Sequence, residues 1–194
     1  MQKLNSFVYR FTLGAAVAAL PLTALAQMSA KPSPSAAGGT TPAADSKFVR
    51  AAAEGGMAEV ELGKLATEKA SSEEVKKFGE RMVNDHTKAN DQLKQVAENK
   101  GIQLPDKLSP KDQMTKEHLS KLSGEQFDKA YMNDMVKDHT QDVADFKRES
   151  NSGTDADVKN FAATTLPTIE DHLKQAKEIA PSSRSASNNM KGSQ

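Results

Sequence analysis

Cysteine is absent from all 194 residues of the chain. Its absence excludes disulfide bonds, a thiolate metal site and the acylated cysteine that anchors a lipoprotein. Any folded domain of this chain must therefore be stable through its packed core alone.

An excess of charge of either sign is also absent, because 26 lysine and arginine residues are balanced by 26 aspartate and glutamate residues. Removal of an N-terminal signal containing Lys3 and Arg10 would leave 24 basic side chains against 26 acidic ones. A nucleic-acid partner requires a concentrated basic field, so we expect none.

Residues 1–26 have the layout of a secretory signal peptide, with Lys3 and Arg10 before an apolar run and small residues before Gln27. The unbroken apolar run is shorter than the roughly 20 residues that a helix needs to span a bilayer. We therefore expect export, most simply to the periplasm of a Gram-negative bacterium, and no integral membrane span after cleavage.

Two further segments have little apolar bulk: residues 27–44, "QMSAKPSPSAAGGTTPAA", and residues 181–194, "PSSRSASNNMKGSQ". Such compositions bury too little surface to offset the entropy lost on ordering. We predict a disordered tether and a disordered tail. The remainder, residues 45–180, is the size of one domain.

Runs of β-branched residues are scarce between residues 45 and 180, where Ala, Lys, Glu, Gln, Leu and Met dominate and favour helix. Capping residues and glycines divide this region into four long predicted helices, at about 45–70, 71–101, 123–149 and 154–179. Asp45 or Ser46 is the expected cap of the first. The fold class is therefore all-α, a four-helix bundle with a long connection between helices two and three. Two prolines interrupt this connection, which leaves room for a short helix at about 110–122.

Residues at a spacing of three and four mark the face that each helix buries. Each face carries one ionisable residue among apolar ones, and these are Glu59, His86, His139 and His172. The three histidines occur in related phrases, "MVNDHT" at 82–87, "MVKDHT" at 135–140 and "TIEDHL" at 168–173. Buried polar groups need partners, so the four residues are expected to meet.

A metal site would satisfy them, with the three imidazoles as nitrogen ligands and Glu59 as an oxygen ligand. This set suits one zinc, copper, iron or manganese ion better than calcium or magnesium. The preceding aspartates are the expected outer partners of the histidines on neighbouring helices. They are Asp85, Asp138 and Asp171.

A metal-free hydrogen-bonded network of the same residues is the alternative. Counted from the nearest turns, Glu59 and His86 lie at similar heights, whereas His139 and His172 differ by about 10 Å. Pro167 would change this difference if it kinked or restarted the last helix. The Gly55-Gly56 pair predicts close packing of a neighbouring helix. His118 lies in the connection and is expected to be solvated.

The run from "FVRAAAEGGMAEVELGKLATEK" to "ENKGIQLP", together with "MVKDHT" and "LPTIEDHLKQA", resembles the exported bacterial family called domain of unknown function 4142. The resemblance covers about residues 48–179 and implies a ferritin-like fold. Ferritin-like di-iron enzymes carry a Glu-x-x-His motif on two helices. Here Val83 and Ile169 stand where those glutamates would be, which disfavours two-metal oxidation chemistry.

We therefore expect an exported, soluble protein of the cell envelope that binds one metal ion, with a role in stress tolerance or metal handling. The first alternative is a structural or interaction module with a protein partner in the envelope, and the second is a ferritin-like oxidoreductase. No catalytic residue set or cofactor fingerprint is visible in the sequence.

Overall fold

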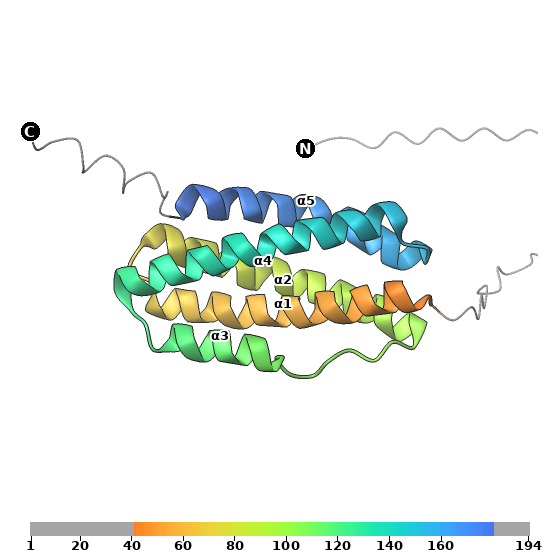
Figure 1. Cartoon of the computed structure of the whole chain (residues 1–194), viewed down its shortest axis with the longest axis horizontal. Helices are drawn as coiled ribbons and strands as arrows, with labels where there is room; N and C mark the ends of the chain where they lie inside the picture. The colour runs from red at the N-terminus through yellow and green to blue at the C-terminus, as the bar shows by residue number, and fades with distance from the viewer. Residues whose placement is uncertain (1–40, 181–194) are drawn as a thin grey trace, which may run out of the picture. The chain divides into compact units, whose positions relative to one another are not determined.

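The computed structural model describes residues 41–180, which form five helices and no strand (Figure 1). The helices are α1 (Ala43–Lys69), α2 (Glu73–Lys100), α3 (Pro110–Ser120), α4 (Gly124–Ser152) and α5 (Ala156–Ile179). The prediction of an all-α fold is confirmed for these residues. The predicted signal peptide, most of the tether and the tail lie outside the described residues.

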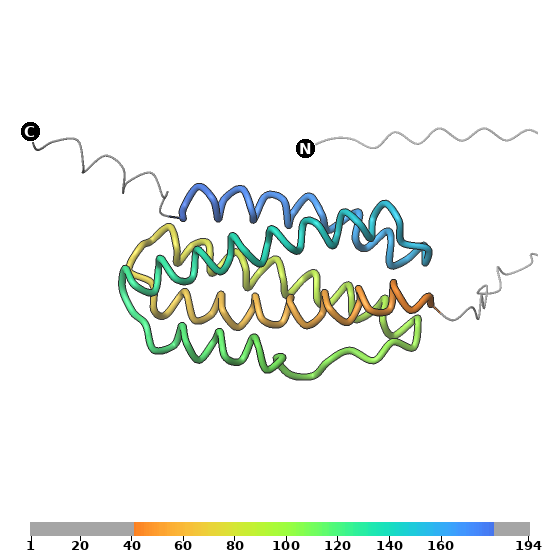
Figure 2. The backbone as a smooth tube through the Cα atoms, in the orientation of Figure 1, coloured from red at the N-terminus to blue at the C-terminus, as the bar shows by residue number. Residues whose placement is uncertain are grey.

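Four long helices enclose the interior: α1 packs along α2, α4 packs along α5, and the two pairs meet through α1 with α4 and α2 with α5. The long connection runs back along the length of the helices, so that α2 and α4 point the same way (Figure 2). Within this connection, α3 packs against α1 and α4. No helix among residues 41–180 is both long and apolar enough to cross a membrane.

Side-chain caps mark the start of three of the five helices, α2, α3 and α5, and a left-handed glycine marks the end of α2. Ser72 caps α2 by accepting a hydrogen bond from the amide of Glu74, and Asp155 caps α5 by accepting from two amides of its first turn. Gly101 ends α2 in the left-handed conformation, with φ of 64°, which glycine adopts without steric cost. These three positions lie within about one residue of the boundaries predicted for these helices, 71–101 and 154–179.

The start of α1 differs from the prediction. The helix begins at Ala43 with Pro42 at the N-cap and no side-chain cap, so neither Asp45 nor Ser46 serves that purpose. The buried Asp45 carboxylate instead accepts hydrogen bonds from Thr154 N, Thr154 Oγ1 and Asp155 N at 3.0, 3.0 and 2.6 Å. Asp45 thus fastens the first turn of α1 to the turn between α4 and α5.

The predicted inward faces are buried or half-buried throughout, and they form two apolar clusters. One cluster contains Leu62, Phe78, Met82 and Met135, and the other contains Leu93, Phe146 and their neighbours. The four ionisable residues fall between the two clusters along their helices. A polar layer therefore crosses the middle of an otherwise apolar core.

Glycines set the distance between α1 and α2, at Gly63 and Gly79 and also at Gly56 of the predicted pair. A Cβ at Gly63 would lie 2.7 Å from the carbonyl oxygen of Gly79, so the two backbones touch there. A Cβ at Gly56 would meet the side chain of Asn90, whereas one at Gly55 would meet nothing within 4 Å. The backbone-to-backbone contact of the two helices thus depends on Gly63 and Gly79.

We predict opposite effects for two alanine substitutions in α1. Gly63→Ala should lower the free energy of unfolding by about 1–3 kcal/mol, because backbone atoms cannot give way as a side chain can. Gly55→Ala should raise it by up to about 1 kcal/mol, because alanine favours helix and the space is open. Urea denaturation followed by circular dichroism measures both. Equal stability of the two variants would contradict the close contact.

Candidate metal centre

Three histidine side chains from three helices meet in the polar layer. The ring centroids of His86 on α2, His139 on α4 and His172 on α5 are separated by 5.7, 5.3 and 5.4 Å. Their exposed fractions are 5, 0 and 0 %. One ring nitrogen from each lies within 4.8 Å of the others.

His139 and His172 meet although the sequence predicted a height difference of about 10 Å. Counted from the ends of the helices, His139 lies 13 residues before Ser152 and His172 lies 16 residues after Ala156, a difference of about 4.5 Å. Helical side chains lean toward the N-terminus of their own helix. Because of this tilt, the His139 side chain points away from the α4–α5 turn and the His172 side chain points toward it. The tilt therefore offsets the remaining height difference of about 4.5 Å. Pro167 is not required for this, because α5 continues through it without a break.

Hydrogen bonds on the outer side fix the orientation of two rings. His139 Nδ1 lies 3.0 Å from the carbonyl oxygen of Met135, and His172 Nε2 lies 3.0 Å from Asp85 Oδ2. Both oxygens accept, so these nitrogens carry the protons. The other nitrogens, His139 Nε2 and His172 Nδ1, are buried without a partner among residues 41–180, as is His86 Nε2.

The three imidazoles are held in their neutral form. Burial, together with the neighbouring histidines, lowers the pKa of His86 to about 3 and that of His139 to about 4. Burial also lowers the pKa of His172, against the hydrogen bond to Asp85, which favours the protonated ring. Neutral imidazole is the form that binds a metal ion.

Only one of the three predicted outer carboxylates contacts a histidine. Asp85 bonds His172 on the neighbouring helix, as expected, and also accepts from Arg81 Nε at 3.2 Å. Asp171 is half exposed and pairs with Arg81 at 2.7 Å instead. Asp138 faces α3, where Lys111 lies 3.8 Å away. Arg81, which the sequence analysis missed, therefore links Asp85 and Asp171; its position four residues before Asp85 was the available signal.

Glu59 is buried near the histidines but does not join all three of them. Its Oε1 lies 3.6 Å from His139 Nδ1, and its Oε2 has no partner among the described residues. Glu59 instead groups with His139 and Asp142, whose ligand atoms lie within 4.8 Å of one another. The predicted single set of four ligands is therefore two overlapping groups that share His139.

Asp142 is the residue that sequence reasoning overlooked. It stands three residues after His139 on α4, a spacing that places both on one side of a helix. Burial raises the pKa of Asp142 to about 7, with Asp138 and Asp145 adding to the rise. Burial, followed by the charges of Asp142, Asp138, Asp134 and Asp112, also raises the pKa of Glu59 well above its ordinary value.

A cavity of about 20 Å³ lies beside His86 and is also lined by Gly55, Asp142 and Thr165, among others, but not by His139 or His172. This volume is enough for about one water molecule. A ligand of that size thus has room beside His86. His118, the fourth histidine, is exposed on α3, as expected.

A helical bundle with a buried histidine cluster is the class that the fold and this geometry define. The chain belongs to the family described as "Domain of unknown function (DUF4142)", which it matches over residues 29–179. No curated protein is significantly similar to it in sequence.

Two solved structures share the fold at low sequence identity. A DUF305 fragment from Deinococcus radiodurans is 14% identical, with a TM-score of 0.64 over 73% of this chain and 97% of that one. A DUF305 protein from Streptomyces coelicolor, provisionally described as secreted, is 17% identical, with a TM-score of 0.59 over 70% of this chain and 91% of that one.

We predict that His86 makes the metal-free protein sensitive to acid. Between its unfolded pKa of about 6.5 and its folded pKa, the unfolded chain binds a proton that the folded chain does not. The free energy of unfolding therefore falls as the pH falls through this window. From pH 7 to pH 5 the wild type should lose about 2 kcal/mol more than the His86→Gln variant.

Urea denaturation of both proteins at each pH, in the presence of a chelator, measures this difference. The same loss in the wild type and in His86→Gln would show that the His86 ring is not held neutral.

Proposed function

We propose that this protein is an exported, soluble, ferritin-like four-helix bundle of the bacterial envelope that binds one transition-metal ion through His86, His139 and His172. One observation carries the proposal: one nitrogen from each of three buried rings lies within 4.8 Å of the others, in rings that each have a buried nitrogen with no hydrogen-bond partner among residues 41–180. We propose a role in metal handling or stress tolerance for such a site, by binding rather than by catalysis.

The donor set favours a metal such as zinc, copper, iron or manganese. Three neutral imidazoles suit these ions, and a site with three protein ligands keeps a further position open. In a tetrahedral site, two nitrogens bound to one zinc ion at about 2.1 Å lie about 3.4 Å apart. The ring nitrogens lie within 4.8 Å of one another, so they would need to approach by up to about 1.4 Å to reach this geometry.

The alternative of a purely hydrogen-bonded network is less well supported. The bonds to Asp85 and Met135 occupy only the outer nitrogens of His172 and His139. A network would be expected to satisfy the inner nitrogens too, because each buried polar atom without a partner costs about 1–3 kcal/mol. A bound metal ion satisfies all three together.

The helix arrangement supports the ferritin-like assignment. Two antiparallel pairs, joined by one connection that crosses the length of the bundle, match the ferritin-like connectivity (Figure 2). The chain departs from the di-iron enzymes because Val83 and Ile169 replace the glutamates of the two metal-binding motifs. This departure is the reason for proposing binding rather than oxidation.

Export is supported by the sequence of residues 1–26 and by the provisional description of the Streptomyces coelicolor protein as secreted. The basic start, apolar run and small residues before Gln27 have the order of a cleaved signal. We propose the periplasm of a Gram-negative bacterium as the location.

Metal binding is tested by isothermal titration of the chelator-treated protein with Zn²⁺. The wild type should bind about one equivalent, as a site of three imidazoles requires. His86→Ala should weaken binding more than about tenfold, because the loss of an outer partner alone costs 10–100-fold. His118→Ala is the matched control and should bind as the wild type does.

Absence of binding, together with a melting temperature that Zn²⁺ leaves unchanged, would favour the hydrogen-bonded network instead.

A further inference from the structure

A second group of potential ligands lies at a groove outside the histidine cluster. The groove has a volume of about 270 Å³ and is lined by residues of α1, α3 and α4. Five carboxylates line it, and Lys111 is the one basic residue among them. The carboxylates belong to Glu54, Glu59, Asp112, Asp138 and Asp142.

The groove reaches a buried carboxylate. Glu59 lines the groove although its exposed fraction is only 3 %, and its Oε2 is buried with no hydrogen-bond partner among residues 41–180. A buried carboxylate oxygen without a donor is costly. Glu59 therefore requires either a proton or a positively charged ligand.

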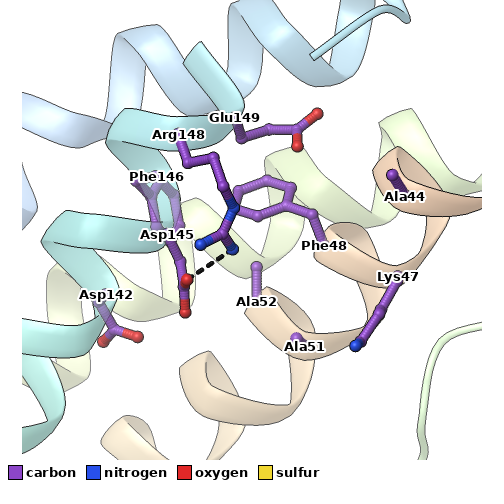
Figure 3. A pocket seen from close by; sticks show the side chains of 10 residues that line it. All are labelled: Ala44, Lys47, Phe48, Ala51, Ala52, Asp142, Asp145, Phe146, Arg148 and Glu149. Carbon is purple, nitrogen blue, oxygen red and sulfur yellow. Dashed lines mark hydrogen bonds and ion pairs between the residues drawn. The ribbon is translucent and has the colours of Figure 1, made fainter. Parts of the chain in front are cut away.

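Asp142 lies beside Glu59 and also lacks a partner. No hydrogen bond or ion pair within residues 41–180 involves its side chain, whereas Asp145, on the same helix, pairs with Arg148 at 2.6 Å (Figure 3). Asp142 lines three cavities: this groove, the pocket of Figure 3 and the small cavity beside His86. It therefore stands between solvent and the histidines.

We propose that Glu59 and Asp142 bind a divalent cation at the inner end of this groove, at a subsite that adjoins the histidine site through His139. The subsite extends the metal-binding function proposed above, because it gives the protein a second, oxygen-based position for a metal ion.

The spacing of the ligand atoms matches a single small divalent ion better than a larger cation. Ligand atoms of Glu59, Asp142 and His139 lie within 4.8 Å of one another, and two oxygens on opposite sides of an ion at 2.0–2.4 Å lie about 4–4.8 Å apart. His139 Nδ1 already donates to Met135, so the available ligands are the carboxylate oxygens. Water from the groove supplies the remaining positions.

The charges around the subsite favour occupation by a cation. Burial raises the pKa of Glu59, and the negative charges of four nearby aspartates raise it too. These are Asp142, Asp138, Asp134 and Asp112. Lys111 is 70 % exposed and lies 3.8 Å from Asp138. It therefore offsets the negative charge of the aspartates only at the solvent-exposed edge of the groove. A divalent ion would relieve the repulsion at the inner end.

Manganese is the probe, because Mn²⁺ accepts carboxylate and water ligands and its free form has a distinct paramagnetic resonance signal. The chelator-treated full chain is titrated with Mn²⁺ and the loss of the free signal is measured. The wild type should bind one equivalent at this subsite. Asp142→Asn and Glu59→Gln, which keep the side-chain shape, should each weaken binding by more than about tenfold.

Two further variants are the controls. Asp145→Asn, on the same helix with its own arginine partner, should bind Mn²⁺ as the wild type does. His86→Ala should also retain Mn²⁺ binding, because His86 is not part of the subsite.

The outcomes separate the two proposals. Unchanged Mn²⁺ binding in Asp142→Asn and Glu59→Gln, or no Mn²⁺ binding by the wild type, would overturn the carboxylate subsite. Mn²⁺ binding that is lost in His86→Ala and kept in Asp142→Asn would also overturn it, while supporting the histidine site. Mn²⁺ binding that depends on Asp142, in a protein that does not bind Zn²⁺, would support the subsite and count against the histidine site alone.

Discussion

Burial of three neutral imidazoles in one layer is the constraint on which the rest of this structure depends. Two apolar clusters exclude water from His86, His139 and His172, and burial keeps the rings uncharged. Unprotonated nitrogens in such a place need a donor or a metal ion. The fold provides a hydrogen bond to one nitrogen of His139 and one of His172, and it leaves the other nitrogen of each ring buried without a partner among residues 41–180.

The helices set this geometry through short-range features. Close contact of Gly63 with Gly79 sets the approach of α1 and α2, and Asp45 joins α1 to the turn between α4 and α5. The Arg81–Asp85–His172 chain then fixes one ring from outside. Each feature holds a helix at a defined depth or rotation, which is what convergence of side chains from separate helices requires.

Local patterns predicted the elements and the inward faces well, because helix caps and a spacing of three and four are properties of nearby residues. Local patterns failed where the contacts of a side chain depend on segments that are distant in the sequence. The first aspartate of α1, Asp45, looked like a helix cap until the α4–α5 turn was placed beside it. The height of the His172 side chain depended on its tilt along the helix as well as on the residue count. Asp142 belongs to the site because it lies beside Glu59 of α1, which the pattern of α4 alone does not reveal. Glu59 was correctly placed in the core near His139, but its grouping with Asp142 rather than with His86 and His172 was not predicted.

X-ray absorption at the zinc edge of the zinc-loaded protein tests the central claim most directly. The account predicts three imidazole nitrogens at about 2.0–2.1 Å, with the multiple-scattering pattern of intact rings. A first shell of oxygen atoms alone, or of a single imidazole, would contradict the convergence of His86, His139 and His172 on one ion.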